Sequence, residues 1–189
     1  MNRTTLATSV IAAIAGLVLV QPAGAVTQTR YTIQTGANMC TLSIPTTDTK
    51  VRPKATGFNN EGTTNAFVIC SFNPPPGSTG ISGGFNTAAL VLKSLDGADH
   101  TVTCTAVNSL ADAEFADIDS PQYVSKTLVV NDADPTYQTL GTPFSWEPED
   151  FGGTDMIPFS GGTFSVTCVL PPQVSVKFGS GISDEDIGS

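Results

Sequence analysis

The sequence predicts an all-β protein, an antiparallel β-sandwich of about eight strands that is jelly-roll-like or immunoglobulin-like. Several segments alternate apolar and polar residues with the period of two of a half-buried strand, most clearly residues 163–170 (TFSVTCVL). Three of the four cysteines lie inside such segments with apolar neighbours two residues away. Turn-forming residues separate the segments at intervals of about 8 to 15 residues, as in sandwich domains.

The first half of the chain contains strands on both sides of a long loop. Residues 59–62 (NNEG) have the composition of a turn, and residues 74–84, rich in proline and glycine, form the loop. The Asp96-Gly97 dipeptide predicts that the segments before and after it pair as a hairpin. The expected strands are residues 29–35, 39–44, 55–58, 65–72, 86–95 and 100–107, with residues 46–54 as an extended edge.

The second half alternates strands with acidic loops. Residues 112–120 are either a helical turn or a loop that ends at Pro121. Pro171 and Pro172 separate the last two strands, which belong to the stretch 161–182. The other expected strands are residues 123–130, 139–146 and 156–160.

Residues 1–25 have the features of a signal peptide. Arg3 supplies the positive n-region, residues 6–20 are apolar, and residues 23–25 (AGA) form an A-x-A cleavage site. We therefore expect an exported mature chain, residues 26–189, that forms a single β-sandwich domain in the periplasm or outside the cell. No later apolar run approaches the roughly 20 residues of a membrane helix, so membrane insertion is not expected.

The charge balance argues against nucleic acid as a partner. The whole chain has 8 Lys+Arg and 17 Asp+Glu; without Arg3 the balance is 7 against 17, a net charge of −10. Such a surface repels phosphate backbones. Lys50, Arg52 and Lys54 form the one basic concentration, and we interpret them as a solvated edge in preference to an anion site.

Cys40, Cys70, Cys104 and Cys168 predict two disulfides in an exported chain. Four cysteines allow three connectivities, of which we favour Cys40 with Cys70 and Cys104 with Cys168. A zinc site is disfavoured because no C-x-x-C pair is present. We expect no metal centre and no cofactor, although Asp132 and Asp134 are weak candidates for calcium among the acidic pairs of the loops.

Two motifs resemble catalytic sets without the context that catalysis requires. Residues 80–84 (GISGG) satisfy G-x-S-x-G, but a nucleophile elbow needs a following helix, and residues 86–95 alternate like a strand. His100 is the sole histidine and begins a strand after a turn, where we expect a solvated side chain and not a general base.

Carbohydrate chemistry is suggested by one acidic and aromatic region. Glu147, Glu149 and Asp150 could act as the paired carboxylates of a glycosidase, although acids around Pro148 are typical of an exposed loop. The aromatic residues of the region are candidates for sugar binding, with core packing as the alternative. They are Trp146, Tyr137 and Phe144.

The chain resembles a loose set of small exported bacterial four-cysteine proteins of uncharacterised function. The matching features are the signal peptide, Cys40, the Gly-x-x-Asn segment 57–60, the V-x-C strand 68–70 and the V-x-C-x-L-P-P segment 166–172. In the commoner pattern of these proteins a proline follows the second cysteine. This chain departs from that pattern, because Ser71 follows Cys70. The resemblance implies a β-sandwich with two disulfides and assigns no catalytic or binding residue.

We expect a non-catalytic exported protein, a binding or surface-associated module at or outside the cell envelope. Envelope polysaccharide and a second copy of the chain are the candidate partners. One alternative is a structural subunit that assembles by strand exchange, with residues 26–35 as the donated strand. The other alternative is a secreted carbohydrate-active hydrolase that uses the carboxylates of residues 147–155.

Overall fold

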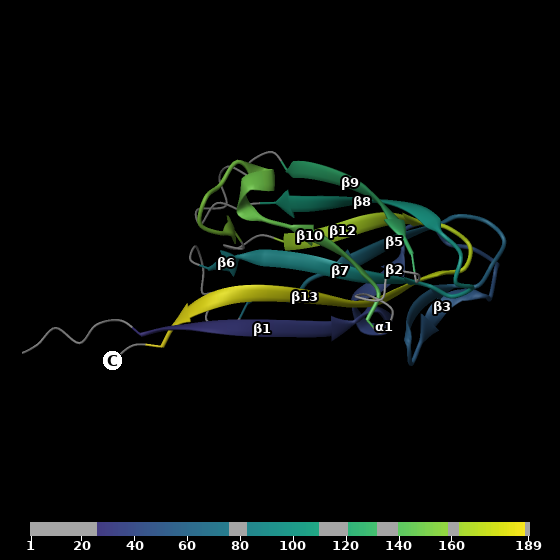
Figure 1. The fold of residues 1–189 in the computed structure, drawn as a ribbon, viewed down its shortest axis with the longest axis horizontal. Coiled ribbons are helices and arrows are strands. Elements are labelled where there is room, and N and C mark those ends of the chain that lie inside the picture. Colours follow the sequence, from purple (N-terminus) through teal and green to yellow (C-terminus); the bar gives the residue numbers. More distant parts are fainter. Residues whose placement is uncertain (1–25, 76–82, 110–120, 132–139, 159–162, 188–189) are drawn as a thin grey trace, which may run out of the picture.

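Two antiparallel sheets pack face to face in the structure, a computed structural model that describes residues 26–75, 83–109, 121–131, 140–158 and 163–187 (Figure 1). The predicted fold class, an antiparallel β-sandwich with two disulfides, is confirmed. The strand labels run to β13, more than the eight expected, because several strands have only two to four residues.

Sheet A contains the first and the last strands of the chain. Its order is β10 (Thr142–Trp146), β7 (Thr87–Ser94), β13 (Val174–Asp186), β4 (Gly57–Asn60) and β3 (Val51–Lys54), and β1 (Thr27–Thr35) also pairs with β13. The helical turn α1 (Gly36–Met39) carries the chain from β1 toward sheet B.

Sheet B has the order β2 (Cys40–Leu42), β5 (Ala66–Ser71), β12 (Thr163–Leu170), β8 (His100–Ser109) and β9 (Gln122–Val130). Two short strands, β6 (Gly84–Phe85) and β11 (Ile157–Pro158), form a separate ribbon. The 3₁₀ helix η1 (Pro148–Phe151) follows β10.

Strand β13 organises sheet A because it pairs along both of its edges. One edge pairs with β7, while the other pairs first with β4 and then with β1. A bulge between Val176 and Phe178 marks the point where the partner changes. Gly57 (φ 136°) lies against this bulge, and a Cβ at this position would come within 2.4 Å of the Val176 carbonyl oxygen. The junction therefore requires glycine in β4.

The core lies between the two sheets. Edge-to-face contacts join Phe72, Phe85, Phe151 and Phe164 at one end, with ring centroids 5.1 to 6.0 Å apart. The cysteines are buried, and both disulfides lie within sheet B: Cys40 pairs with Cys70 and Cys104 with Cys168, each across neighbouring strands. The favoured connectivity is confirmed.

The predicted hairpin around Asp96-Gly97 is wrong. β7 lies in sheet A between β10 and β13, whereas β8 lies in sheet B between β12 and β9. The chain does reverse at Gly97 (φ 78°), but residues 95–99 cross the roughly 10 Å between the layers. A turn signal specifies the reversal, and the choice of neighbouring strand depends on distant residues.

The predicted turn at residues 59–62 is also wrong at its start. Asn59 and Asn60 belong to β4 and are buried, with 4% and 0% exposure. The Asn60 amide donates to the carbonyls of Thr64 and Leu170, and its oxygen accepts the Gly62 N–H. These bonds satisfy the side chain inside the sandwich, where composition alone predicts exposure.

Candidate binding surface

The outward side chains of sheet B form a surface without a charged group. We call it the sheet B outer face, which consists of Thr41, Phe67, Ile69, Ser71, Thr101, Thr103, Thr105, Val107, Tyr123, Ser125, Thr127, Val129, Thr163, Ser165, Thr167 and Val169. All sixteen follow from strand alternation, since most of the residues between them are buried in the core. Ten are threonine or serine, so hydroxyl groups dominate the face.

The strand register aligns these side chains in rows across the sheet. One row crosses all five strands and contains Ser125, Thr105, Thr167, Ile69 and Thr41. The hydroxyls of Thr105 and Ser125 lie 2.7 Å apart, and those of Thr103 and Thr127 in the next row lie 2.8 Å apart. These cross-strand hydrogen bonds fix the positions of the four hydroxyl groups.

Two exposed aromatic rings lie at opposite sides of the face. Tyr123 on β9 is 67% exposed and Phe67 on β5 is 42% exposed. Three strand spacings separate β9 from β5, which corresponds to about 14 Å. The rings therefore flank a floor of hydroxyl and methyl groups.

A cavity of about 240 Å³ adjoins the face beside Phe67. Its wall combines apolar side chains with threonine and asparagine and carries no charge. The lining residues are Leu42, Ile44, Pro45, Thr46, Val51, Thr64, Asn65, Ala66 and Phe67. The uncharged face thus continues into an uncharged hollow between the edges of the two sheets.

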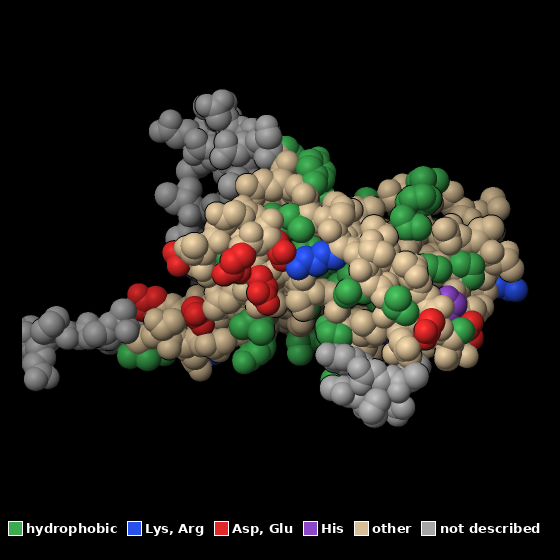
Figure 2. Space-filling view, turned by 45° about the horizontal axis from the view of Figure 1, so that its top comes forward, with side chains coloured by type: hydrophobic (Ala, Val, Ile, Leu, Met, Phe, Trp, Pro, Cys, Tyr) green, Lys and Arg blue, Asp and Glu red, His purple; other side chains and the backbone are tan. Residues whose placement is uncertain are grey.

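No acidic side chain of the described residues belongs to the sheet B outer face. Figure 2 shows acidic side chains gathered toward one end of the visible surface beside a basic group, and a smaller acidic group near the histidine at the other end. Among the described residues, β13 contributes Asp184 and Glu185 at its end, where Thr29 and Arg30 of β1 bind them. The pKa of Asp184 is lowered by hydrogen bonds from Asn86 and Thr29.

The candidate hydrolase carboxylates serve the structure around η1. Asp150 accepts hydrogen bonds from Lys126 Nζ (2.6 Å) and from the Glu147 N–H (2.9 Å). Burial is the largest influence on the pKa of Asp150 and raises it, but the bonds from Lys126 and Glu147 together outweigh burial and lower the pKa. Glu147 caps η1, while Glu149 is exposed. An ion-paired Asp150 is a poor general acid.

The aromatic candidates for sugar binding lie elsewhere. Trp146 and Phe144 have 0% exposure and pack in the core, so neither presents a ring face to a ligand. The Trp146 indole N–H donates to the Val124 carbonyl across the seam between the sheets. Tyr137 lies outside the described residues. Sequence reasoning did not identify Tyr123 and Phe67, although their positions in alternating strands could have indicated them.

His100 has a partner that the sequence analysis did not identify. Its Nε2 lies 2.8 Å from Asp96 Oδ1, four residues earlier. The His100 hydrogen bond, followed by those from the Ala98 N–H and the Ser94 hydroxyl, lowers the pKa of Asp96 to about 2. The contact closes the loop between the layers. Residues 80–82 of the G-x-S-x-G motif lie outside the described chain.

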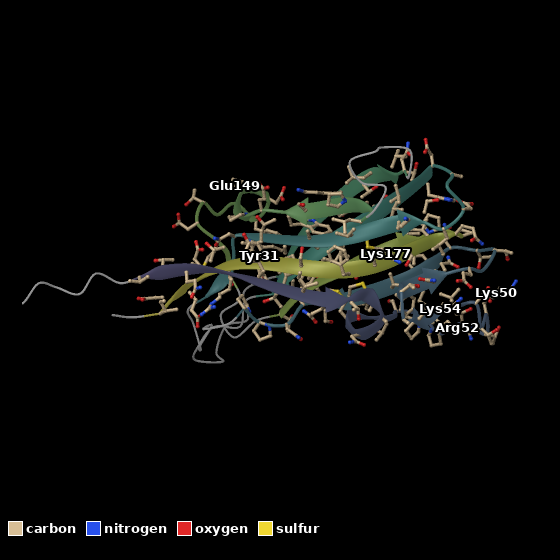
Figure 3. All side chains as sticks on the ribbon, turned by 60° about the horizontal axis from the view of Figure 1, so that its bottom comes forward. Tyr31, Lys50, Arg52, Lys54, Glu149 and Lys177 are labelled. Carbon is tan, nitrogen blue, oxygen red and sulfur yellow. A yellow bond between two sulfur atoms is a disulfide. The ribbon has the colours of Figure 1, made fainter. Side chains whose placement is uncertain are left out.

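Sheet A carries further basic residues besides the basic concentration found in the sequence. Lys50, Arg52 and Lys54 lie at one end of the molecule, and Lys177 of β13 is also on sheet A (Figure 3). Burial and the nearby charge of Lys93 lower the pKa of Lys177. Lys54 is paired with Glu61 at 2.5 Å. The pairing of β13 with β7 places Lys177 near Lys93, and local spacing in the sequence does not reveal that pairing.

The described residues contain no group of three or more His, Cys, Asp or Glu side chains arranged to hold a metal ion. Asp132 and Asp134, the weak calcium candidates, lie outside the described ranges. In the same ranges, no helix has both the length and the apolar character needed to cross a membrane.

Residues 26–35 were expected as a donated strand; of these, residues 27–35 pair with β13 of the same chain over nine consecutive positions. Tyr31 and Ile33 point to solvent on the outer side of sheet A, with 70% and 69% exposure.

No family model, no curated protein and no solved structure matches this chain.

Proposed function

We propose that the mature chain is an exported, non-catalytic binding protein that acts at or outside the cell envelope, and that the sheet B outer face binds a neutral polysaccharide. The absence of charge from the sixteen side chains of this face, in a protein with 17 acidic residues, is the observation that carries the proposal. Two disulfides are typical of exported proteins and support the location.

The chemistry of the face favours this ligand class. Threonine and serine hydroxyls donate and accept hydrogen bonds, which suits the hydroxyls of a sugar chain. The exposed rings of Tyr123 and Phe67 offer apolar surface to sugar C–H groups. An anionic polymer would meet long-range repulsion from a protein with this net charge, whereas a neutral one would not.

The site around Asp150 supports a non-catalytic role. Lys126 and the Glu147 N–H occupy the Asp150 carboxylate, and that arrangement joins β9 to η1. A glycosidase needs two carboxylates that face a common cleft. Asp150 does not meet this requirement, because its carboxylate is held by Lys126 and the Glu147 N–H.

Affinity electrophoresis through gels containing soluble α-glucan, β-glucan, mannan or galactan tests the proposal, with alginate as the anionic comparison. We expect retardation by at least one neutral polymer and none by alginate. Thr103→Glu should raise the dissociation constant at least tenfold, because it places an unpaired charge within the bound surface.

Thr56→Glu is the matched control, since it makes the same change at an exposed position in the turn between β3 and β4 of sheet A. It should bind like the wild type. Failure of all four neutral polymers to retard the protein would overturn the proposal. Equal loss in Thr56→Glu and Thr103→Glu would overturn the assignment to sheet B.

A further inference from the structure

Strand β1 has a free edge that differs from the other sheet edges among the described residues. It is nine residues long and pairs with β13 without a register shift. It contains neither proline nor lysine. A long, regular edge presents unpaired N–H and C=O groups that can pair with another strand.

The other edge strands have features that hinder pairing with a further strand. In β3, Pro53 removes a donor and is flanked by Arg52 and Lys54, and β2 has only three residues. β9 and β10 cover one another, because Trp146 donates to the Val124 carbonyl and Lys126 donates to the Ser145 carbonyl. In the part of the chain that the structure describes, β1 has no such feature.

Both ends of the β1 sequence are symmetric about Tyr31. Thr27 matches Thr35 and Gln28 matches Gln34, four and three positions on either side. Antiparallel pairing of two β1 strands centred on Tyr31 therefore places identical residues opposite one another at the centre and at both ends, which are five of the nine positions. It also places Arg30 opposite Thr32 of the second copy, which avoids contact between two arginines.

The exposed side chains fit the same arrangement. Tyr31 and Ile33 share the outer side of sheet A with Ile182, which lies opposite Tyr31 on β13. A two-fold axis at Tyr31 would bring both tyrosines together and place each Ile33 opposite Thr29 of the second copy. Arg30, which faces the other side, is already paired with Glu185 at 2.7 Å. The edge thus presents apolar groups and neutralised charge.

We propose that the mature chain forms a two-fold symmetric homodimer through antiparallel pairing of its β1 edges, centred on Tyr31. The two copies of sheet A become one continuous sheet, and each β1 keeps its place beside its own β13. This interface is isologous, because each residue i meets residue 62 − i of the second copy. It is edge addition, in contrast to strand exchange.

Analytical ultracentrifugation of the mature chain measures the association. We expect a dimer in the wild type, and Tyr31→Lys should raise its dissociation constant at least tenfold by placing two like charges opposite one another at the axis. Tyr123→Lys is the control, since Tyr123 has nearly the same exposure (67% against 70%) on sheet B, and it should leave the dimer intact. A wild type that stays monomeric at about 0.1 mM would overturn the proposal, as would a dimer unchanged by Tyr31→Lys.

Cysteine crosslinking tests the register without relying on the lysine variant. Opposite Cα atoms in an antiparallel pair lie about 4.5 to 5.5 Å apart, which suits a disulfide. Tyr31→Cys should therefore form a covalent dimer under oxidising conditions. Ile33→Cys should not, because two copies of residue 33 would be offset by four residues, about 13 Å. Crosslinking of Ile33→Cys in preference to Tyr31→Cys would overturn the register.

A double variant separates edge addition from strand exchange. Ile33 lies opposite Ser180 in the register between β1 and β13. In Ile33→Cys/Ser180→Cys, edge addition predicts a disulfide within one chain and a monomer on non-reducing gels. Strand exchange predicts a disulfide between chains and a covalent dimer, and this result would overturn the proposal.

Discussion

Cys104 and Cys168 lie directly opposite one another in sheet B, with Cα atoms 4.1 Å apart, so their disulfide joins neighbouring strands of one sheet and not the two layers. Cys40 and Cys70 have the same relationship on β2 and β5. Sheet B is therefore covalently reinforced, whereas core packing and the seam contacts hold sheet A against it.

Removal of the disulfide that closes the longer loop should lower the free energy of unfolding substantially. The Cys104–Cys168 pair spans 64 residues, for which the chain-entropy model gives about 4 kcal/mol. Cys104→Ala/Cys168→Ala should lower the free energy of unfolding by about that amount in urea titrations. Cys40→Ala/Cys70→Ala should cost somewhat less, because its span is 30 residues. A loss below about 1 kcal/mol for the longer loop would contradict the entropic account.

Gly57 and Gly97 both have positive φ, of 136° and 78°, but only Gly57 is crowded. Gly57→Ala should lower the free energy of unfolding by more than about 2 kcal/mol, because backbone strain adds to contact with the Val176 carbonyl. Gly97→Ala, with open space around the new methyl, should cost only the strain of about 1 kcal/mol. Equal losses in thermal or urea unfolding would show that the bulge does not require the glycine.

Lys126 joins three elements, since its ammonium binds Asp150 of η1 and the Ser145 carbonyl of β10 from its place on β9. Lys126→Met should lower the free energy of unfolding by about 1 to 2 kcal/mol and raise the pKa of Asp150. The exposed Lys50→Met variant serves as the control and should stay within about 0.5 kcal/mol of the wild type. A neutral Lys126→Met variant would mean that the seam does not depend on this ion pair.

Asp96 should make part of the stability depend on acid pH. Its pKa in the folded protein is about 2, below the ordinary value of 3.8. A lowered folded-state pKa contributes stability above about pH 4, and that contribution is lost as the pH falls through 3.8 toward 2. Carbon-detected NMR titration of the Asp96 carboxyl should give a midpoint near 2 in the wild type and a higher one in His100→Gln. A wild-type midpoint at 3.8 would contradict the contact with His100.

Alternation identified most strands because it depends only on which side of a strand faces the core. Residues 163–170 and 123–130 were located within a residue of β12 and β9. The pairing of β7 and β8 was missed because membership of a sheet is decided by contacts with strands far away in the sequence. Asn59 and Asn60 were misplaced because their hydrogen-bond partners, Ser175 and Leu170, lie more than 100 residues away.

The candidate surface was only partly accessible to sequence reasoning. Each strand of sheet B shows polar or small residues at alternate positions, but the strand order joins them into one face. The importance of Trp146 was overestimated as a ligand platform, because an aromatic residue next to acidic residues looks exposed in the sequence. Its indole is instead a structural donor to Val124 at 3.2 Å.

The most direct test of the account is to map the ligand surface by NMR. The amide shifts of residues 26–189 are followed during titration with a neutral oligosaccharide taken from the polymer that retards the protein. We predict that the perturbed amides cluster on β5, β8, β9 and β12, in the rows around Thr105 and Thr167, and extend toward Tyr123 and Phe67. Perturbations confined to sheet A, or centred on η1 and Glu149, would contradict the central claim that the sheet B outer face is the binding surface.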